Sequence, residues 1–150
     1  MINSNNFTKS ILMTGLILTA QVHAKSKCPE AISGAVQTAY PESKISSCKQ
    51  EKEDGKIQFV VSLASKTAGN VELDLDTTGS ILLTEQIVPV DSVSKGAMSG
   101  FKSKYPGVKI SRAEKQTKPD GSVTYELSFQ DKNKKHDATF RQNGEFVELE

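Results

Sequence analysis

The sequence predicts an α+β fold made of two tandem repeats, each with an N-terminal helix packed on a four-stranded antiparallel sheet. The chain resembles itself at an offset of 65 residues, because AYPESKIS (39–46) aligns with KYPGVKIS (104–111). Self-similarity at a fixed period indicates repeated structural units. Apolar residues with helical spacing precede both segments. Runs that alternate apolar and polar residues follow both segments, as in half-buried strands.

Residues 1–24 have the features of a secretory signal peptide. One positive charge, Lys9, precedes an apolar run from Ile11 to Ala20, and small residues at Val22 and Ala24 predict cleavage after Ala24. The apolar run is too short for a membrane span. We therefore expect a mature chain that is exported, to the periplasm, without membrane insertion.

The self-alignment predicts the domain boundaries. The first repeat spans 25–87, the connector VPVDS spans 88–92, and the second repeat spans 93–150. Within each repeat, the relatively short spacing between turn signals favours one helix followed by four short strands.

Each predicted helix is a stripe of apolar residues spaced three or four positions apart. The first stripe begins at Ile32 and ends at Tyr40, and Pro41 stops the helix. The second, weaker stripe runs from Ala97 to Tyr105 and is stopped by Pro106-Gly107. Both helices are expected to cover one face of their sheets.

The predicted strands alternate with a period of two, which indicates one buried face and one exposed face. The runs IQFVVSL (57–63), VELDLD (71–76) and VTYELSF (123–129) follow this pattern. Asp54-Gly55 and Asp120-Gly121 are typical of hairpin turns. The outward-facing residues of these strands form the candidate partner-binding face: Gln58, Val60, Ser62, Glu72, Asp74, Asp76, Thr124, Glu126 and Ser128.

Cys28 and Cys48 are predicted to form a disulfide. They are the only cysteines of the chain, and an even number in an exported protein favours a bridge. The 19 residues between them do not provide the C-x-x-C spacing of a redox pair. We expect a structural bridge rather than free thiols.

The segment DLDTTGSILLTE (74–85) resembles a calcium-binding loop, with Asp74, Asp76 and Glu85 at ligand positions. An EF-hand needs a helix on both sides, whereas strand-like residues surround this segment. The equivalent segment at 139–150 carries Arg141 in place of Asp76 but keeps a glycine. We therefore predict a hairpin turn with a glycine bulge, and no metal site. A weak ion site at Asp74 and Asp76 is the alternative.

Charge and histidine content limit the function classes. Without Lys9, 18 basic residues balance 18 acidic ones, so nucleic-acid binding is not expected. After cleavage His136 is the only histidine, and no serine or cysteine forms a recognisable catalytic pair with it. We predict that the protein is not an enzyme and needs no cofactor.

The sequence resembles the PepSY-like, β-lactamase-inhibitor-like family of small exported bacterial domains. The similar features are the helix end Phe101-x-x-x-Tyr105-Pro106-Gly107, the strand YELSF (125–129), the terminal hairpin F-x-x-N-G-E-F (140–146) and VELDLDTTGSIL (71–82). The resemblance implies tandem helix-plus-sheet units like those of β-lactamase inhibitory proteins, which grip an enzyme with a concave sheet surface. It also implies roles such as restraint of peptidases or sensing in the envelope. No inhibitory residue is carried over, and the chain has no tryptophan.

These observations lead to a functional hypothesis. We expect a non-catalytic periplasmic module that docks an exported or envelope protein or peptide, of unknown identity, through the exposed sheet face. The alternative is an ion- or stress-sensing domain that uses the acidic stripe of Glu72, Asp74 and Asp76. A hydrolase is disfavoured, because the paired carboxylates are expected on an open strand surface.

Overall fold

The computed structural model describes residues 28–53, 55–64 and 70–150. The predicted signal peptide, its cleavage site and Asp54 lie outside these residues. Within the described part of the chain, neither α-helix is long and apolar enough to cross a membrane.

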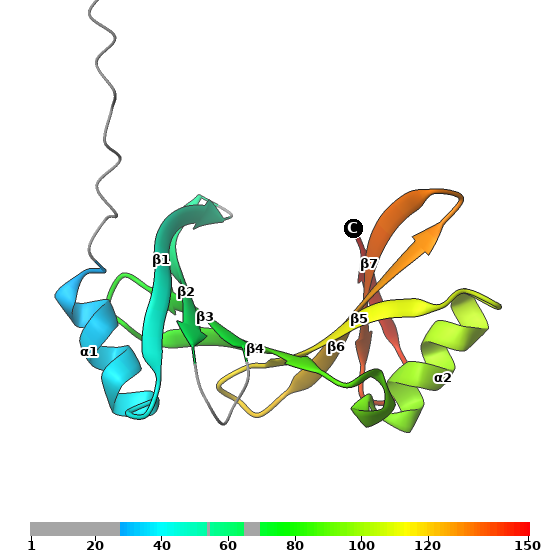
Figure 1. Cartoon of the computed structure of the whole chain (residues 1–150), viewed down its shortest axis with the longest axis horizontal. Coiled ribbons are helices and arrows are strands. Elements are labelled where there is room, and N and C mark those ends of the chain that lie inside the picture. Colours follow the sequence, from blue (N-terminus) through cyan, green and yellow to red (C-terminus); the bar gives the residue numbers. More distant parts are fainter. Residues whose placement is uncertain (1–27, 54, 65–69) are drawn as a thin grey trace, which may run out of the picture.

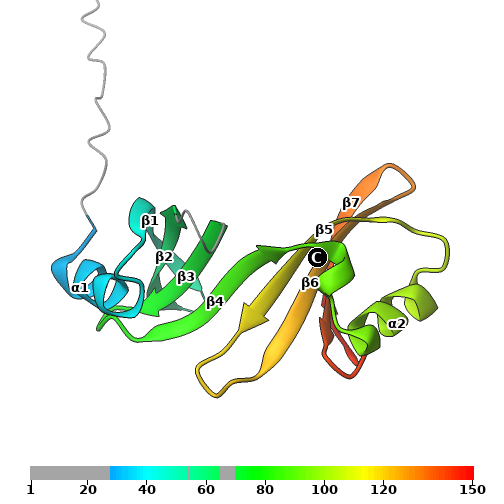
Figure 2. The same cartoon turned by 60° about the horizontal axis from the view of Figure 1, so that its bottom comes forward.

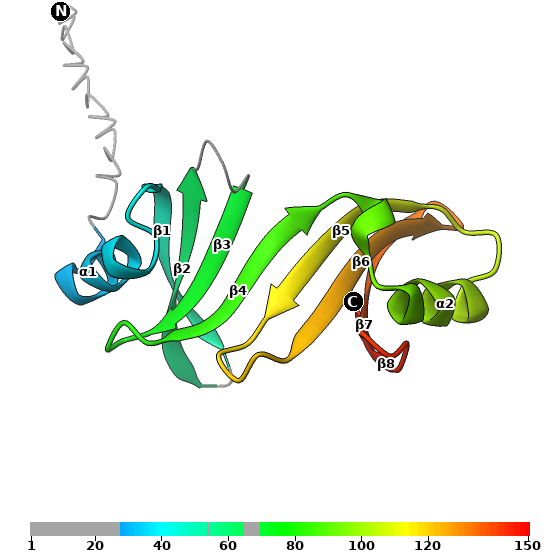
Figure 3. The same ribbon diagram turned by 90° about the horizontal axis from the view of Figure 1, so that it is seen from below.

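Eight strands form a single antiparallel sheet in the order of the sequence, from β1 to β8. Figure 3 shows neighbouring strands side by side, with the two α-helices at opposite ends of the sheet. The elements are α1 (Glu30–Ala39), β1 (Lys44–Glu53), β2 (Lys56–Ala64), β3 (Asn70–Asp76), β4 (Ile81–Val88), the 3-10 turn η1 (Val90–Ser92), α2 (Lys95–Lys104), β5 (Ile110–Thr117), β6 (Val123–Asp131), β7 (Lys134–Arg141) and β8 (Phe146–Leu149).

The predicted α+β fold of two tandem repeats, each with its own four-stranded sheet, is wrong. β4 and β5 pair from Thr84↔Thr117 to Val88↔Ala113, so one continuous sheet spans the chain. The described structure is mainly β, with two α-helices. The physical reason is that two separate sheets would expose the backbone donors and acceptors of β4 and β5 at their edges. Pairing these strands with each other satisfies both edges.

The sheet is bent into a trough. In Figure 1 the strands near β1 and β7 rise on either side of β4 and β5, and both helices lie outside the trough. Figure 2 shows the same placement of α1 and α2 from another direction. We call the side of the sheet that α1 and α2 cover the helix face, and the opposite side the concave face.

The helix face carries two separate apolar clusters. α1 buries Ile32 and Val36 against β2 and β3, and α2 buries Ala97 and Phe101 against β5, β6 and β7. The predicted helical stripes are therefore confirmed at these positions. The strand residues in the two clusters are Val61, Leu63, Val71, Leu73 and Leu75 below α1, and Ala113, Tyr125, Leu127, Phe129, Ala138 and Phe140 below α2.

The start of α2 is capped by a residue that the sequence prediction missed. The Ser94 hydroxyl oxygen accepts a hydrogen bond from the Ala97 N–H at 3.1 Å and donates one to the Gln142 carbonyl at 3.0 Å. A serine N-cap satisfies one of the free N–H groups at a helix start. The second bond also joins the helix start to the β7–β8 turn.

Glycines allow α2 to approach this turn closely. A Cβ on Gly96 would lie 2.2 Å from the Gln142 carbonyl oxygen, and a Cβ on Gly100 would lie 2.2 Å from that of Gly144. Real Cβ atoms are not found this close to a backbone oxygen. At the other end of the molecule, α1 approaches the β3–β4 turn with Ala31 and Ala35 next to Gly79. The contact of α2 is therefore the closer of the two and requires glycine on both sides.

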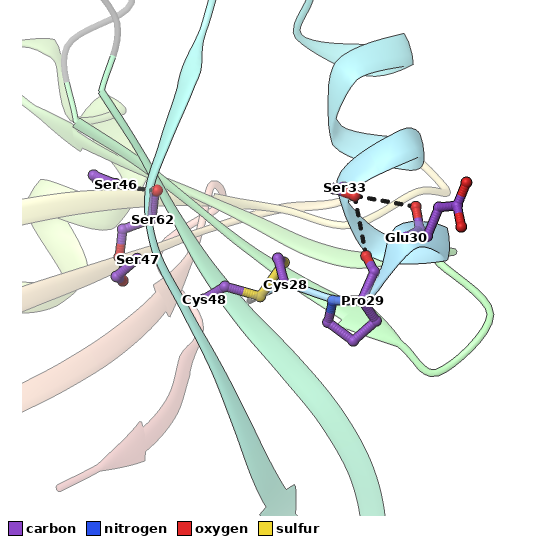
Figure 4. The surroundings of a disulfide bond; sticks show 8 residues. All are labelled: Cys28, Pro29, Glu30, Ser33, Ser46, Ser47, Cys48 and Ser62. Atoms are coloured by element: carbon purple, nitrogen blue, oxygen red, sulfur yellow. Dashed lines mark hydrogen bonds between the residues drawn. A yellow bond between two sulfur atoms is a disulfide. The ribbon is translucent and has the colours of Figure 1, made fainter. Parts of the chain in front are cut away.

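The disulfide prediction is confirmed. Cys28 and Cys48 are bonded, with their Cα atoms 5.5 Å apart. Figure 4 shows that the bridge links Cys28, which lies just before Pro29 and the start of α1, to Cys48 in strand β1. Next to the bridge, the Ser33 hydroxyl donates to the Pro29 carbonyl at 3.1 Å. The bridge thus anchors the start of α1 to the sheet.

Candidate functional site on the concave face

Strand alternation brings most of the predicted binding residues to the concave face. Val61 and Leu73 are buried on the helix face, so Val60, Ser62, Glu72 and Asp74 point to the other side. A hollow of about 530 Å³ lies there. The predicted residues that line it are Gln58, Val60, Ser62, Glu72 and Asp74, and they are joined by Ser47, Lys49, Glu51, Lys52, Glu85 and Glu150.

Thr124, Glu126 and Ser128 of β6 lie on the same face, because they alternate with the buried Tyr125, Leu127 and Phe129. They do not line the hollow. The structure therefore brings five predicted residues together and places these three further along the same surface.

Asp76 is not part of the hollow. Its carboxylate accepts hydrogen bonds from the N–H of Thr78 at 2.8 Å, the hydroxyl of Thr78 at 2.6 Å and the N–H of Ser80 at 2.9 Å. These bonds lower the pKa of Asp76, with the Thr78 hydroxyl as the largest cause. Asp76 thus closes the β3–β4 turn.

The hairpin interpretation of 74–85 is confirmed. The Gly79 N–H donates to the Asp76 carbonyl at 3.1 Å, and Gly79 has φ +92°. The Asp76 N–H donates to the Ser80 carbonyl at 3.0 Å, so Gly79 and Ser80 together lie opposite Asp76, as in a glycine bulge. The register shift between Asp74 and Leu75 is a separate irregularity, in which Leu82 is the extra residue of β4. Among the described residues, no group of three or more histidines, cysteines or acids could hold a metal ion.

Asp76→Ala is expected to lower the thermal unfolding temperature at neutral pH equally with and without calcium. The reason is that the carboxylate stabilises the turn rather than binding an ion. Because folding lowers the pKa of Asp76, its contribution is present above the ordinary value of 3.8 and is lost as the pH falls through the lower folded value. Thermal melts of the mature protein at pH 7 and pH 3 check this. A calcium-dependent rise in the unfolding temperature of the wild type, absent in Asp76→Ala, would contradict it.

Hydrogen bonds connect the polar side chains across the strands. Ser47 donates to Ser62 at 2.9 Å, and Ser62 donates to the Glu72 carboxylate at 2.8 Å. Further along, the Gln116 amide donates to Glu85 at 2.9 Å and to Glu126 at 3.3 Å. Strands β4, β5 and β6 are thus joined by one amide group between two carboxylates.

The side chain of Gln116 is itself held in place. Its carbonyl oxygen accepts a hydrogen bond from the Thr124 hydroxyl at 2.8 Å. The two carboxylates fix which end of the amide faces them, because a reversed amide would turn its acceptor oxygen toward them. Of the predicted residues, Thr124 therefore positions Gln116, while Glu126 accepts from it.

The carboxylates of this face lie opposite one another in the sheet register. Glu72 pairs with Glu85 across β3 and β4, and Glu114 pairs with Glu126 across β5 and β6. Like charges directly opposite each other destabilise a sheet. Arg112 binds the Glu114 carboxylate. We call Glu72, Glu85, Glu114 and Glu126 the carboxylate row.

Burial and mutual repulsion change the acidity of this row. Burial is the main cause that raises the pKa of Glu126 to about 7, followed by the charges of Glu114, Asp137 and Glu85. Burial also raises the pKa of Glu85, although the Gln116 hydrogen bond opposes this effect. Both side chains are half-buried on the surface of the sheet.

Sequence reasoning did not assign Glu85, Glu114 or Gln116 to the binding face. The segment ISRAEKQT (110–117) has no regular apolar alternation, so its facing could not be read from the pattern. Only the β4–β5 register, in which Glu85 lies opposite Gln116, brings these residues together. The available signal was that Arg112, Glu114 and Gln116 are polar residues at every second position, as on the exposed face of a strand.

His136 lies away from this face. It pairs with the buried Phe129 in the register and stacks on its ring, with centroids 5.5 Å apart. It is therefore on the helix face, without access to the carboxylate row. Within the described residues, the concave face thus combines acids, a smaller number of bases, amides and hydroxyls, but lacks a histidine.

A second, more apolar groove of about 890 Å³ lies beside α2. Val90, Met98 and Val108 are among the residues that form its walls, with Lys102 and Lys109 among the polar ones. None of the predicted binding residues lines this groove.

Comparison with known proteins identifies the fold. No family model and no curated protein sequence matches the chain. Solved structures do match, and each of the following covers 83% of this chain. A DUF2874 family protein from Bacteroides uniformis has a TM-score of 0.68 at 13% identity, with 89% of its chain covered. A BLIP-like protein from Bacteroides fragilis has a TM-score of 0.63 at 18% identity, with 86% covered.

A third structure, a candidate periplasmic protein from Bacteroides eggerthii, has a TM-score of 0.68 at 11% identity, with 88% of its chain covered. At such identities the likeness concerns the fold alone. The trough-shaped sheet with two outer helices is therefore the fold of the BLIP-like and DUF2874 proteins.

Proposed function

We propose that this chain is a non-catalytic periplasmic module that docks a protein partner through its concave face. The observation that carries the proposal is the hollow itself. It is lined by Gln58, Val60, Ser62, Glu72 and Asp74, which the strand pattern assigns to the exposed face of the sheet. The helices cover only the other side of the sheet, so this face is open to a partner.

The fold and the names of its relatives support the same proposal. A BLIP-like protein and a candidate periplasmic protein share the fold. We also propose that the chain is related to PepSY-like domains and that its export signal is cleaved after Ala24. The proposal assigns partner contacts to the predicted residues of the concave face. Asp76 contributes by stabilising the β3–β4 turn.

The charge of the face indicates the chemistry of the partner. Glu51, Glu72, Asp74, Glu85 and Glu150 line the hollow, against Lys49 and Lys52. Electrostatic complementarity speeds association and selects partners. We therefore expect a partner that presents a surface rich in lysine or arginine. Because Val60 is the apolar residue of the hollow, it is the expected place for an apolar contact.

A photo-crosslinking amino acid at Val60 is expected to capture a discrete partner in envelope extract from the organism that encodes the chain. The matched control places the same amino acid at Thr38, which is exposed on α1 and outside the hollow. Mass spectrometry of the crosslinked bands is the measurement. The Val60 adduct should disappear when Glu72→Lys and Glu85→Lys are added, because these changes reverse the charge of the face.

Three results would contradict the proposal. They are capture of the same protein from Thr38 and Val60, capture from Val60 that survives the two lysine substitutions, and no adduct from Val60 in extracts in which a known crosslinking control succeeds. Circular dichroism of each variant separates a lost contact from a lost fold.

A further inference from the structure

The carboxylate row holds more negative charge than its neighbours can neutralise. Glu72 faces Glu85 and Glu114 faces Glu126 across adjacent strands. Facing side chains in an antiparallel pair have Cβ atoms about 4.5–5.5 Å apart. Two such pairs on adjoining strand pairs, on one face, place four carboxylates within a small area.

The hydrogen bonds around the row do not resolve this repulsion. Gln116 supplies one amide group to both Glu85 and Glu126. Arg112 binds Glu114 and lies opposite Ser128, two residues along β6 from Glu126. A neutral amide stabilises two neighbouring carboxylates less than a proton would, because a proton removes one of the two charges.

The charged groups that face Glu126 come from every neighbouring strand. β5 contributes Glu114 and Arg112, and β4 contributes Glu85. β7 contributes Asp137, opposite Ser128, and Arg141, opposite Thr124, and Arg141 pairs with Glu145 at 3.3 Å. β8 contributes Glu148, opposite the buried Thr139 that pairs with Glu126. Acids outnumber bases in this set: Glu85, Glu114, Asp137, Glu145 and Glu148 against Arg112 and Arg141.

We propose that the carboxylate row is a pH-responsive charge switch on the concave face, which takes up a proton at Glu126 as the pH falls from slightly alkaline to slightly acidic. This inference rests on the proposed function for its consequence: protonation removes negative charge from the face and weakens its attraction for a cationic partner. The raised pKa values of Glu126 and Glu85 agree with the geometry. A protonated Glu126 can also donate a hydrogen bond to a neighbouring carboxylate, which a charged one cannot.

The free protein provides the first test, which needs no partner. The side-chain carboxyl carbons of the mature, full chain are followed by NMR from pH 3 to pH 9. The Glu126 signal, assigned by its loss in Glu126→Gln, is expected to titrate near pH 7. A Glu126 midpoint no higher than the ordinary value of 4.5 would overturn the proposal.

Two further variants test the cause of the shift. Glu114→Gln should move the Glu126 midpoint to lower pH, since it removes the facing charge. Arg112→Gln should move it to higher pH, since it removes the cation next to Glu114. Because these variants leave Glu126 in place, they keep the test valid even if Glu126→Gln folds poorly. Midpoints that do not move in either variant would show that the row does not act as a coupled group and would overturn the proposal.

Thermal stability gives an independent readout with a defined sign. Folding raises the pKa of Glu126, so its favourable contribution is present below the unfolded value of 4.5 and is lost as the pH rises through about 7. Glu126→Gln should therefore unfold at a higher temperature than the wild type at pH 8 and at the same temperature at pH 4. A lower unfolding temperature of Glu126→Gln at pH 8 would argue against the switch.

A cationic probe tests the consequence for binding. Hexalysine labelled with fluorescein stays charged between pH 6 and pH 8, since lysine titrates near 10.4. Fluorescence anisotropy should show an affinity for the wild type that falls several-fold from pH 8 to pH 6, and a much smaller fall for Glu126→Gln. An equal fall in both proteins would overturn the link between the switch and cation binding. Failure to find a natural partner would contradict the proposed function while leaving the titration result unaffected.

Discussion

Replacing Gly100 with alanine is expected to destabilise the protein by about 1–2 kcal/mol, although the same change stabilises most helices. Alanine favours a helix interior over glycine by about 1 kcal/mol. Here the new Cβ would lie 2.2 Å from the carbonyl oxygen of Gly144. The obstacle is backbone rather than a flexible side chain, so α2 must move away from the β7–β8 turn. Overpacking of this kind costs about 1–3 kcal/mol and can exceed the helical gain.

Movement of α2 would disturb several contacts at once. Ser94 would lose its bond to the Gln142 carbonyl, and Phe101 would shift against Phe129 and Phe140, whose ring centroids lie 5.2 Å and 6.1 Å away. We therefore expect the loss of stability to be concentrated in the half of the molecule that contains α2, which should unfold less cooperatively with the rest. Hydrogen exchange of the β6 and β7 amides would locate it.

Gly34→Ala is the matched control. Gly34 also lies inside a helix, but no atom comes within 4 Å of a Cβ built on it. This variant should gain about 0.5–1 kcal/mol, the ordinary propensity difference. Urea unfolding of both variants gives the two free energies of unfolding. A stabilising Gly100→Ala would show that α2 can withdraw from the turn at little cost, which would contradict the close packing described here.

Removal of the disulfide is expected to cost about 3 kcal/mol, estimated from the entropy of closing the loop between residues 28 and 48. For a chain of this length, that corresponds to a fall of roughly 10 °C in the unfolding temperature. α1 should be affected most. Ala31 and Ala35 keep α1 further from the β3–β4 turn than the glycines of α2 keep that helix from the β7–β8 turn. Because this packing is less close, the bridge supplies part of the attachment of α1.

Two double variants separate the covalent bond from the packing around it. Cys28→Ser with Cys48→Ser removes both the bridge and apolar contacts with the α1 cluster, against which both cysteines pack. Cys28→Val with Cys48→Ala removes the bridge but keeps apolar side chains. Both should lose most of the 3 kcal/mol, and the serine pair should lose more. Hydrogen exchange of α1 in the valine–alanine variant that matches the oxidised wild type would contradict the anchoring role.

Local features of the chain could be predicted from the sequence because they depend on neighbouring residues. The spacing of Ile32 and Val36, and of Ala97 and Phe101, predicted both helices and the sides that they bury. Strand alternation correctly assigned Ser62 and Glu72 to the surface opposite Val61 and Leu73. The glycine bulge at Gly79 and the cysteine pairing followed from turn chemistry and cysteine count.

The position of β4 against β5 could not be predicted, and the error in the fold prediction follows from it. Self-similarity describes how two segments resemble each other, whereas pairing depends on which unpaired edges meet in space. The sequence resemblance thus suggested two separate sheets. The edges of β4 and β5 satisfy their backbone hydrogen bonds by joining, and this produces the continuous trough.

The carboxylate row illustrates the same division. The sequence by itself determined that Glu72 and Glu126 lie on an exposed strand face, because a period of two residues fixes the side to which a side chain points. Only the tertiary structure decided that Glu85 faces Glu72, that Glu114 faces Glu126, and that Gln116 lies between Glu85 and Glu126. The physical reason is that register is a relation between strands: it brings together charges far apart in the chain, and their mutual repulsion and burial exist only once the strands have paired.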